Sequence, residues 1–382
     1  GASITDATKN GTTDTWNFNM AFYNLEADQN KLAGKTFAGT FYVDKDSIQC
    51  DYQNNDGGSS VSGTSFEALM TPNNTDIFNE QGIRYEGADP NNYICLDNKT
   101  SGSCSSSSLL FRIIGLFDED TSSDGITSAG TKKLLKVIDT SNYGTSGEAW
   151  DDGSLKNVKK SIGSREQYKI TLLAPEVGGT GTNGTNNWST ASLKTYGTYL
   201  TTLLRTSSVN SKLSSAITNA KWHLGGASDS NYQTLTTEGI YIEERNTNAI
   251  YSGNPSSIYA QVGLMYPSDY GYATVGGTTT NKSGCRAKEL YNWNGSSFSD
   301  CKNNDWLFTS QDNFEYGAEW LLSPYSSDSK RATILYSLGD VNFTGSSIDI
   351  RFDVRPVFYL DSSILKIVGT GDGTKDNAYR VG

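Results

Sequence analysis

The single histidine of this chain limits the chemistry that the chain can perform. His223 follows Trp222 near the end of a segment that is expected to be helical. Nucleophilic catalysis of the Ser-His-Asp or Cys-His type, and a histidine-based metal centre, would both have to use this side chain. A histidine at the C-terminal end of a helix is more typical of capping or packing. The sequence therefore favours neither kind of catalysis.

Paired carboxylates offer another route to catalysis, because two facing acidic side chains can hydrolyse a glycosidic bond. That chemistry needs carboxyl groups about 5 to 10 Å apart, a separation that spacing along the chain does not establish. Acidic residues at strand ends are more typical of structural ion pairs. A secreted carbohydrate-active enzyme therefore stays an alternative, and we expect no enzyme. The candidate carboxylates are Glu243, Glu244, Asp305, Glu315 and Glu319.

A second acidic cluster follows an apolar run and contains Asp118, Glu119, Asp120 and Asp124. Carboxylate oxygens are the ligands that calcium prefers. The regular spacing of a calcium-binding loop is absent, so the pattern favours a solvated turn. We expect no cofactor, with calcium as the alternative.

The five cysteines bear on whether the chain resides in an oxidising or a reducing compartment. Cys95 and Cys104 flank a short polar loop, and Cys285 and Cys301 flank a longer one. This spacing predicts two local disulfides and leaves Cys50 unpaired. The alternative is five reduced thiols. Disulfides are typical of oxidising compartments, so we expect an extracellular or cell-surface protein.

Composition excludes several classes of partner. The 382 residues carry a formal net charge of −11, which would repel the phosphate backbone of nucleic acid. No stretch approaches the roughly 20 apolar residues of a membrane-spanning helix, so no transmembrane segment is expected. The 22 tyrosines and 7 tryptophans offer enough apolar area for a core, although only 35% of the residues are hydrophobic.

The hydrophobic pattern predicts an α+β fold with a mostly antiparallel sheet and two central helices. The apolar run Leu109–Phe117 predicts a central strand buried on both faces. Apolar residues at helical spacing predict the two helices within residues 186–223. The segment MYPSDYGYAT at 265–274 is expected to be an ordered loop, in which the Asp269 side chain caps backbone N–H groups.

Two regions are expected along the chain. Residues 1–80 are predicted to form an N-terminal β-rich extension, with strands at Thr36–Val43 and Ser47–Tyr52. Residues 81–382 are predicted to form an α+β surface domain.

Several segments occur in an order that resembles a large group of poorly characterised surface proteins of Firmicutes and their mollicute relatives, which often carry a type IV prepilin-like leader. The resemblance covers residues 80–382. It rests on GIRYEGADPNNYICLDN (83–98), LLFRIIGLFDED (109–120), LLKVIDT (134–140), AKWHLGG (220–226), YIEERNTNAIYSGNPSS (241–257), VGLMYPSDYGYAT (262–274), NNDWL (303–307), EWLLSP (319–324), VRPVFYL (354–360) and GTGDGTKDNAYRV (369–381).

The C-terminal segments also resemble C-type-lectin-like and formylglycine-generating-enzyme-like folds. That resemblance implies such a fold for the C-terminal part and a ligand-binding surface within residues 325–353. Arg355 is expected to be structural and to pair with a carboxylate beneath the sheet. The alternative is an ordinary hairpin with a polar outer face. The candidate ligand-binding residues are Tyr325, Arg331, Tyr336, Asn342, Phe343, Asp349 and Arg351.

These observations favour a binding or adhesion domain, such as the head of a pilin-like protein. The expected ligand is a glycan or a protein on a host or bacterial surface. A purely structural surface or filament subunit is the further alternative.

Overall fold

A computed structural model of the chain resolves into two compact units, Gly1–Ser60 and Val61–Gly382. Residues 61–80, which the sequence pattern assigned to the N-terminal extension, therefore belong to the second unit. The structure describes residues 2–5, 15–18, 39–44, 47–52, 63–71, 75–105, 109–140, 148–149, 157–161, 169–173, 185–191, 193–194, 211–308, 317–348 and 351–382.

The first unit contains two antiparallel strand pairs. Strand β1 (Ala2–Thr5) pairs with β2 (Thr15–Phe18), and β3 (Gly39–Asp44) pairs with β4 (Ser47–Tyr52). The second pair agrees with the two strands that the sequence predicts here. Cys50 lies on β4, and its side chain is outside the part of the chain that the structure describes. The prediction that Cys50 is unpaired therefore stays a prediction.

The centre of the second unit is a long antiparallel pair of strands, β8 (Leu110–Ser122) and β9 (Gly130–Asp139). Leu116 and Phe117 are adjacent in a regular part of β8 and both are buried, which means that both faces of the strand are covered. This confirms the central strand predicted from the apolar run. The strand continues to Ser122, so Asp118, Glu119 and Asp120 lie on it and not in the predicted turn.

These strands belong to a sheet of eleven strands in which every pairing is antiparallel except that of β7 with β22. The sheet confirms the predicted α+β class with mostly antiparallel pairing. Its main path runs through β15 (Val262–Gly263), β20 (Val357–Asp361), β9, β8, β7 (Tyr93–Cys95), β22 (Tyr379–Val381) and β21 (Ile367–Val368). Two further strands, β6 (Ile83–Tyr85) and β13 (Asn219–His223), also pair with β8, and they pair in turn with β5 (Ile77–Asn79) and β14 (Ser257–Ala260).

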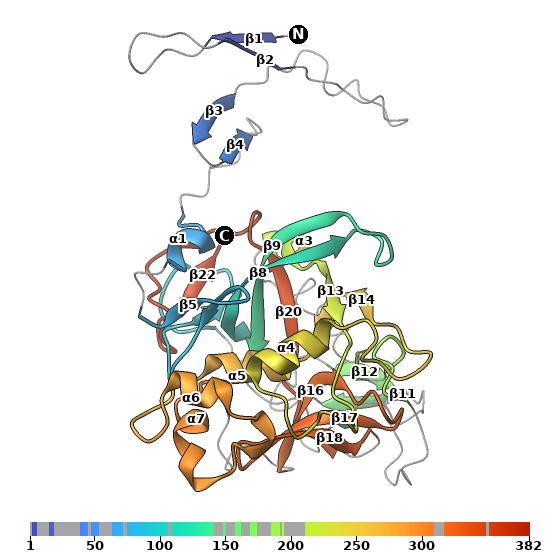
Figure 1. Cartoon of the computed structure of the whole chain (residues 1–382). Coiled ribbons are helices and arrows are strands. Elements are labelled where there is room, and N and C mark those ends of the chain that lie inside the picture. Colours follow the sequence, from blue (N-terminus) through green and yellow to red (C-terminus); the bar gives the residue numbers. More distant parts are fainter. Residues whose placement is uncertain are drawn as a thin grey trace. The chain divides into compact units, whose positions relative to one another are not determined.

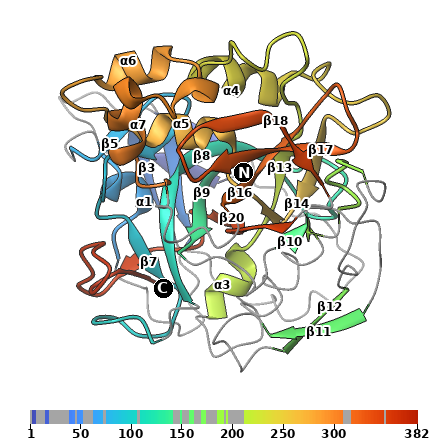
Figure 2. The same ribbon diagram turned by 90° about the horizontal axis from the view of Figure 1, so that it is seen from below.

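A separate antiparallel sheet of three strands contains most of the segment that was predicted to bind ligand. It consists of β16 (Ala318–Pro324), β17 (Arg331–Tyr336) and β18 (Val341–Ser347). Every residue of β16 is buried, and Figure 2 shows β17 and β18 running alongside each other. Two further pairs are β10 (Glu148–Ala149) with β19 (Arg351–Phe352), and β11 (Asn157–Ser161) with β12 (Lys169–Leu173).

The helices are short, and three of them, α5 to α7, lie together beside the sheets (Figure 1). Thr236 caps the start of α4 and Asn281 caps the start of α6, each through a side-chain oxygen that accepts a backbone N–H. The helices are α1 (Phe66–Leu69), α3 (Ser211–Ala216), α4 (Thr237–Arg245), α5 (Pro267–Ala273), α6 (Lys282–Ala287) and α7 (Ser299–Asn303), with 3₁₀ turns at Leu290–Asn292 and Ser296–Phe298.

The predicted second helix, which was to end near His223, is wrong in its C-terminal part. Only α3 is helical there, and Asn219–His223 forms strand β13. Ala220 and Trp222 point into the core while their neighbours are half-buried, which is the period of a strand. Pairing with β14 and β8 fixes this conformation over the local helical pattern. Most of the predicted first helix lies outside the described residues.

The segment predicted as an ordered loop at 265–274 forms helix α5. Pro267 occupies the first turn, where its missing N–H costs nothing. The Asp269 carboxylate accepts the backbone N–H of Tyr266 at 2.9 Å, so the capping part of the prediction is correct. Every residue of α5 is buried, and this burial makes a helix of only seven residues stable here.

Both predicted disulfides are present. Cys95 is joined to Cys104, and Cys285 of α6 is joined to Cys301 of α7, with Cα–Cα distances of 5.7 and 5.5 Å. These distances fall in the normal range for disulfides. The second bridge ties two short helices that bury little surface by themselves.

Replacing Cys285 and Cys301 together by Ala is expected to lower the free energy of unfolding by about 2–3 kcal/mol, because the unfolded chain regains the entropy of the open loop. Urea denaturation without reductant measures the loss. Cys50→Ala is the control and is expected to leave the midpoint unchanged. Equal stability of wild type and the double variant would show that the bridge adds nothing.

Candidate ligand-binding pocket

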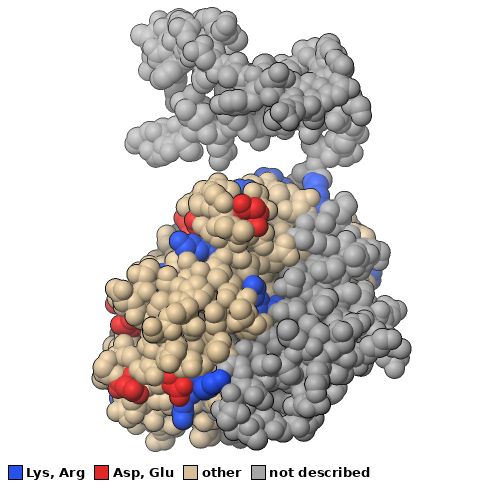
Figure 3. Space-filling view, turned by 90° about the vertical axis from the view of Figure 1, so that its right-hand side faces the viewer, with Lys and Arg blue, Asp and Glu red and all other residues tan. Residues whose placement is uncertain are grey.

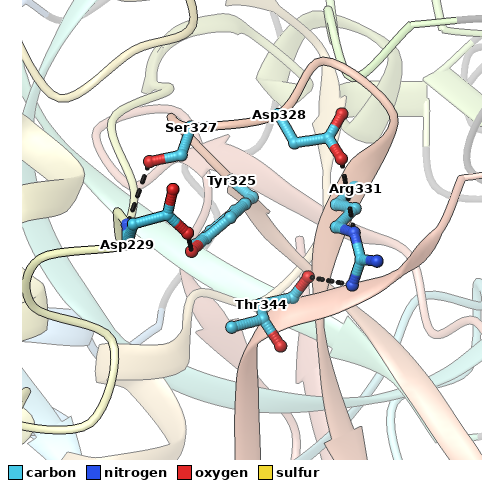
Figure 4. Close-up of a pocket in the computed structure, with 6 residues that line it drawn as sticks. All are labelled: Asp229, Tyr325, Ser327, Asp328, Arg331 and Thr344. Atoms are coloured by element: carbon cyan, nitrogen blue, oxygen red, sulfur yellow. Dashed lines mark hydrogen bonds and ion pairs between the residues drawn. The ribbon is translucent and has the colours of Figure 1, made fainter.

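A polar pocket of about 410 Å³ lies where β16–β18 meet the turn that follows β13. The turn supplies Asp229, the connection between β16 and β17 supplies three lining residues, and β17 and β18 supply one each (Figure 4). The lining residues are Asp229, Tyr325, Ser327, Asp328, Arg331 and Thr344. Five of the six fall within the segment 325–353 that the sequence analysis singled out.

Tyr325 and Asp229 join the two walls of the pocket. The Tyr325 hydroxyl donates to Asp229 Oδ1 at 2.5 Å, and the Asp229 backbone N–H donates to Ser327 Oγ at 2.9 Å. Burial, together with the neighbouring Asp229 carboxylate, raises the pKa of the Tyr325 phenol far above its usual value. The phenol therefore stays protonated and continues to donate, while the exposed Asp229 carboxylate keeps further acceptor capacity.

Arg331 forms the opposite wall. Its Nε lies 3.3 Å from Asp328 Oδ2, and its Nη1 donates to the Thr344 carbonyl at 3.5 Å. The Arg331 side chain is 48% exposed, so part of its guanidinium faces the pocket and solvent. A guanidinium has five N–H donors, and several of them are available to a ligand here.

The loop between β16 and β17 is held from beneath by Asn186. This residue is fully buried, and its Nδ2 donates to the carbonyls of Tyr325, Asp328 and Arg331 at 2.8 to 2.9 Å. Asn254 in turn donates to Asn186 Oδ1 at 2.8 Å. The backbone of the pocket wall is thus fixed before any ligand arrives.

A glycine fixes the position of Thr344 on β18. Gly345 has a φ of +60°, and a Cβ there would lie 1.7 Å from the Ala332 carbonyl oxygen. Only glycine fits this close approach of β17 and β18. The Thr344 hydroxyl donates to Asn342 Oδ1 at 2.8 Å, so Asn342 orients a lining residue.

The structure places the seven sequence-predicted binding residues differently. Tyr325 and Arg331 line the pocket, and Asn342 supports it while its Nδ2 donates to the Tyr336 hydroxyl at 3.4 Å. Phe343 is fully buried in the core and contributes packing only. The side chains of Asp349 and Arg351 lie outside the described residues.

Sequence reasoning missed Asp229 and Asn186. Neither residue lies in the segment 325–353, and no local pattern marks them in a chain rich in Asp, Asn and Ser. Ser327, Asp328 and Thr344 were within the predicted surface but were not named.

Four of the five carboxylates considered for glycosidase chemistry lie in the described part of the chain, and each of these four has protein partners. Ser268 donates through N–H and hydroxyl to buried Glu244, and Glu319 forms a buried bidentate pair with Arg355. This pair confirms the structural role predicted for Arg355. Buried Asp305 accepts the Leu307 N–H at 2.9 Å. Glu243 accepts hydrogen bonds from the side chains of Asn231 and Asn246. Glu315 lies outside the described residues. None of the four described carboxylates lines the pocket.

The acidic cluster considered for calcium also has separate protein partners. Asp118 pairs with Lys133 at 3.0 Å, and Asp120 accepts the hydroxyls of Ser128 and Tyr259. Asp124 caps a turn by accepting the N–H groups of Ile126 and Thr127 at 2.8 and 2.7 Å. Hydrogen bonds and ion pairs of this kind are typical of structural carboxylates at strand ends and turns. Among the described residues, the one group of side chains close enough to hold a metal is Cys95, Asp97 and Cys104, in which both cysteines form a disulfide.

His223 lies on β13 and not at a helix end. Its Nε2 is 3.8 Å from Glu119 Oε2, and Arg245 Nη2 is 3.7 Å from the other Glu119 oxygen. Burial and the Arg245 charge lower the pKa of His223 to about 4. The imidazole is therefore neutral at pH 7.

The surface of the described residues carries charges of both signs. On the face in Figure 3, basic and acidic side chains are scattered among uncharged ones, without a broad basic area. No helix in the described part of the chain is long and apolar enough to cross a membrane.

Glu244 makes stability depend on pH near neutrality. Burial raises the pKa of Glu244 to about 7 from 4.5. Between these values the folded state holds a proton that the unfolded state has released, so stability falls as the pH rises from 4.5 to 7. In the wild type, the free energy of unfolding is expected to fall by an amount on the order of 3 kcal/mol between pH 4.5 and 7. Glu244→Gln is expected to abolish this fall, because glutamine does not titrate.

Urea midpoints from pH 4.5 to 7.5 measure this effect, and Glu243→Gln on the same helix is the matched control. A slope in the Glu244→Gln variant as steep as that of the wild type would assign the pH dependence to other groups.

Comparison of the chain with protein-family models, with curated proteins and with solved structures gave no match. A function must therefore be inferred from the residues of the pocket and from their geometry.

Proposed function

We propose that this chain is the ligand-binding domain of an extracellular or cell-surface protein, and that it recognises a glycan in the pocket between Asp229 and Arg331. The observation that carries the proposal is a cavity of about 410 Å³ lined by carboxylates, hydroxyls and a guanidinium. Small-molecule sites usually have volumes of about 300–1,000 Å³. A short stretch of a sugar chain fits such a space.

The donor and acceptor pattern suits sugar hydroxyls. A hydroxyl can donate to the exposed Asp229 carboxylate and accept from the Arg331 guanidinium, and Thr344 and Ser327 offer groups that do both. Tyr325 adds the edge of an aromatic ring with a polar tip, which is common in recognition sites.

The charge of the pocket narrows the class of glycan. Asp328 compensates the Arg331 charge at 3.3 Å, which leaves Asp229 as the uncompensated charge of the lining. An acidic sugar would meet a carboxylate of its own sign, which weakens binding. Neutral and amino sugars are therefore the favoured ligands.

A fixed backbone supports a binding role. Asn186 holds three carbonyls of the pocket wall, so little conformational freedom is lost when a ligand binds. The proposal includes a lectin-like C-terminal region. Its support is that five lining residues of the pocket lie in the segment 325–353, where that resemblance places a ligand-binding surface. The two disulfides suit the oxidising compartment in which such a domain would act.

Asp229→Ala is expected to weaken glycan binding by about 2 kcal/mol, which is a loss of roughly 30-fold in affinity. The variant also removes the acceptor of the Tyr325 hydroxyl, so the free energy of unfolding should fall by about 1 kcal/mol. A glycan array identifies the ligand, and titration calorimetry with that ligand compares the two proteins. Asp118→Ala, an exposed carboxylate on β8, is the control and should bind as the wild type does.

Two results would count against the proposal. An array without a hit, together with binding to cells whose glycans have been enzymatically removed, would identify a protein ligand. A glycan hit whose affinity is unchanged in Asp229→Ala and in Arg331→Ala would place the binding site elsewhere on the chain.

A further inference from the structure

A lysine and an aspartate meet in the interior of the second unit, far from the surface. Lys136 lies on the central strand β9, and Asp269 is the third residue of α5. Lys136 Nζ is 2.5 Å from Asp269 Oδ2, and each side chain is 1% exposed. The contact joins the central sheet to the helices over 133 residues of chain.

Aromatic rings surround the amine. Lys136 Nζ lies 4.4 Å from the ring centroid of Tyr266 and 5.5 Å from those of Trp222 and Tyr359. Phe117 is 5.6 Å away. An ammonium and a carboxylate have lost their water here, and an ion pair in such surroundings carries a large desolvation cost.

We propose that Lys136 and Asp269 are joined by an intramolecular amide bond in the mature protein. The reaction is a condensation of the two side chains. The nitrogen of Lys136 bonds to Cγ of Asp269, Oδ2 leaves with two hydrogens taken from the nitrogen, and one water molecule is released. The ammonium and the carboxylate together have the composition of the amide plus water, so no oxidant or other reactant is required. This inference is independent of the pocket.

The surroundings determine which step of the condensation is uphill. The proton can pass from nitrogen to Oδ2 across the same short contact, and burial lowers the pKa of Lys136, which helps to free the amine. Burial alone would raise the pKa of Asp269, but the Lys136 and Arg84 cations hold it below its usual value. The proton transfer is therefore the uphill step, which the fixed contact between the two groups assists.

Arg84 is placed to stabilise the attack on the carboxyl carbon. Its Nη1 donates to Asp269 Oδ1 at 2.9 Å, and Oδ1 is the oxygen that gains negative charge when the nitrogen adds. Oδ1 then becomes the amide oxygen and keeps the Arg84 hydrogen bond. The Arg84 side chain is also buried, with 2% exposed, so its position is fixed.

Charge balance is preserved by the reaction. Amide formation removes one positive and one negative charge, those of Lys136 and Asp269. Arg84 loses the charge of Asp269 and keeps a hydrogen bond to the amide oxygen, while the Glu119 carboxylate is near enough for Arg84 to lower its pKa. The product therefore contains two fewer desolvated ions, and Arg84 still has an acceptor.

Mass spectrometry of the whole chain tests the proposal directly. After denaturation and full reduction of the disulfides, the measured mass is expected to be lower than the sequence mass by that of one water molecule. A mass equal to the sequence mass would show an ordinary ion pair and would overturn the proposal. The test uses the wild-type protein, so it does not depend on the folding of a variant.

Peptide mapping locates the lost water. Trypsin does not cleave after an acylated lysine, so peptide 134–156 is expected to be joined to peptide 246–282. Lys136→Arg keeps the charge but cannot form the bond, and its mass should equal its sequence mass. Lys132→Arg, at an exposed pair with Asp361, is the control and should keep the deficit. A deficit without the joined peptides would reflect dehydration at another residue and would also overturn the proposal.

Discussion

Glu319→Ala is expected to lower the free energy of unfolding by about 3–5 kcal/mol. Glu319 is fully buried on β16, and its two oxygens accept Nε and Nη2 of Arg355, each at 2.8 Å. Arg355 also donates to the Leu307 carbonyl at 2.7 Å. Without Glu319 the guanidinium stays buried and loses its counter-charge, which is the costly outcome for a buried ion.

Urea denaturation at pH 7 measures this loss. Asp118→Ala breaks an ion pair with Lys133 whose side chains are 65% and 38% exposed, and should cost less than about 1 kcal/mol. Replacing Glu319 by Leu and Arg355 by Met together should recover much of the stability, because no unpaired charge is then left. A loss in Glu319→Ala no larger than that in Asp118→Ala would contradict the assigned role.

Trp222→Ala is expected to cost about 3–5 kcal/mol, through lost burial and the cavity that remains. Trp222 is fully buried, and its ring centroid lies 4.9 Å from that of Tyr359. Its Nε1 donates to the Ala260 carbonyl at 2.9 Å. A Cβ at Gly263 would lie 2.6 Å from the Trp222 ring, so the backbone there lies directly against the indole.

Thermal and urea unfolding of Trp222→Ala and Trp222→Phe separate the two contributions. The Phe variant keeps most of the ring packing and loses the hydrogen bond to Ala260, so its loss should be clearly smaller than that of the Ala variant. Equal losses in both variants would mean that the hydrogen bond, and not the packing, provides most of the stabilisation.

The central strand and the disulfides could be predicted from the sequence because their causes are local. A continuous apolar run such as Leu109–Phe117 has no polar face to expose, so it must be buried on both sides. Cys95 and Cys104 are separated by only nine positions, and a short polar loop brings them together. Arg355 could be assigned a buried partner, although its identity, Glu319, required the fold.

Predictions from local sequence patterns were wrong where tertiary contacts determine the backbone conformation. The segment that ends at His223 has apolar residues at helical spacing, yet pairing with β14 and β8 makes its last residues a strand. The segment Pro267–Ala273 contains two residues that are typical of turns, Pro267 and Gly271. Because the segment is completely buried, it nevertheless forms a helix. In both cases packing outweighs intrinsic preferences that amount to less than about 1 kcal/mol per residue.

The sequence by itself determined the mostly antiparallel α+β class and both disulfides, whereas the segment 325–353 was singled out by a family resemblance. Only the tertiary structure decided which side chains meet in the pocket. Asp229 reaches Tyr325 across 96 residues of chain, and Asn186 holds the Tyr325 carbonyl across 139. Spacing carries information about neighbours along one strand or helix, whereas such distant pairs are set by how the sheets and turns pack together.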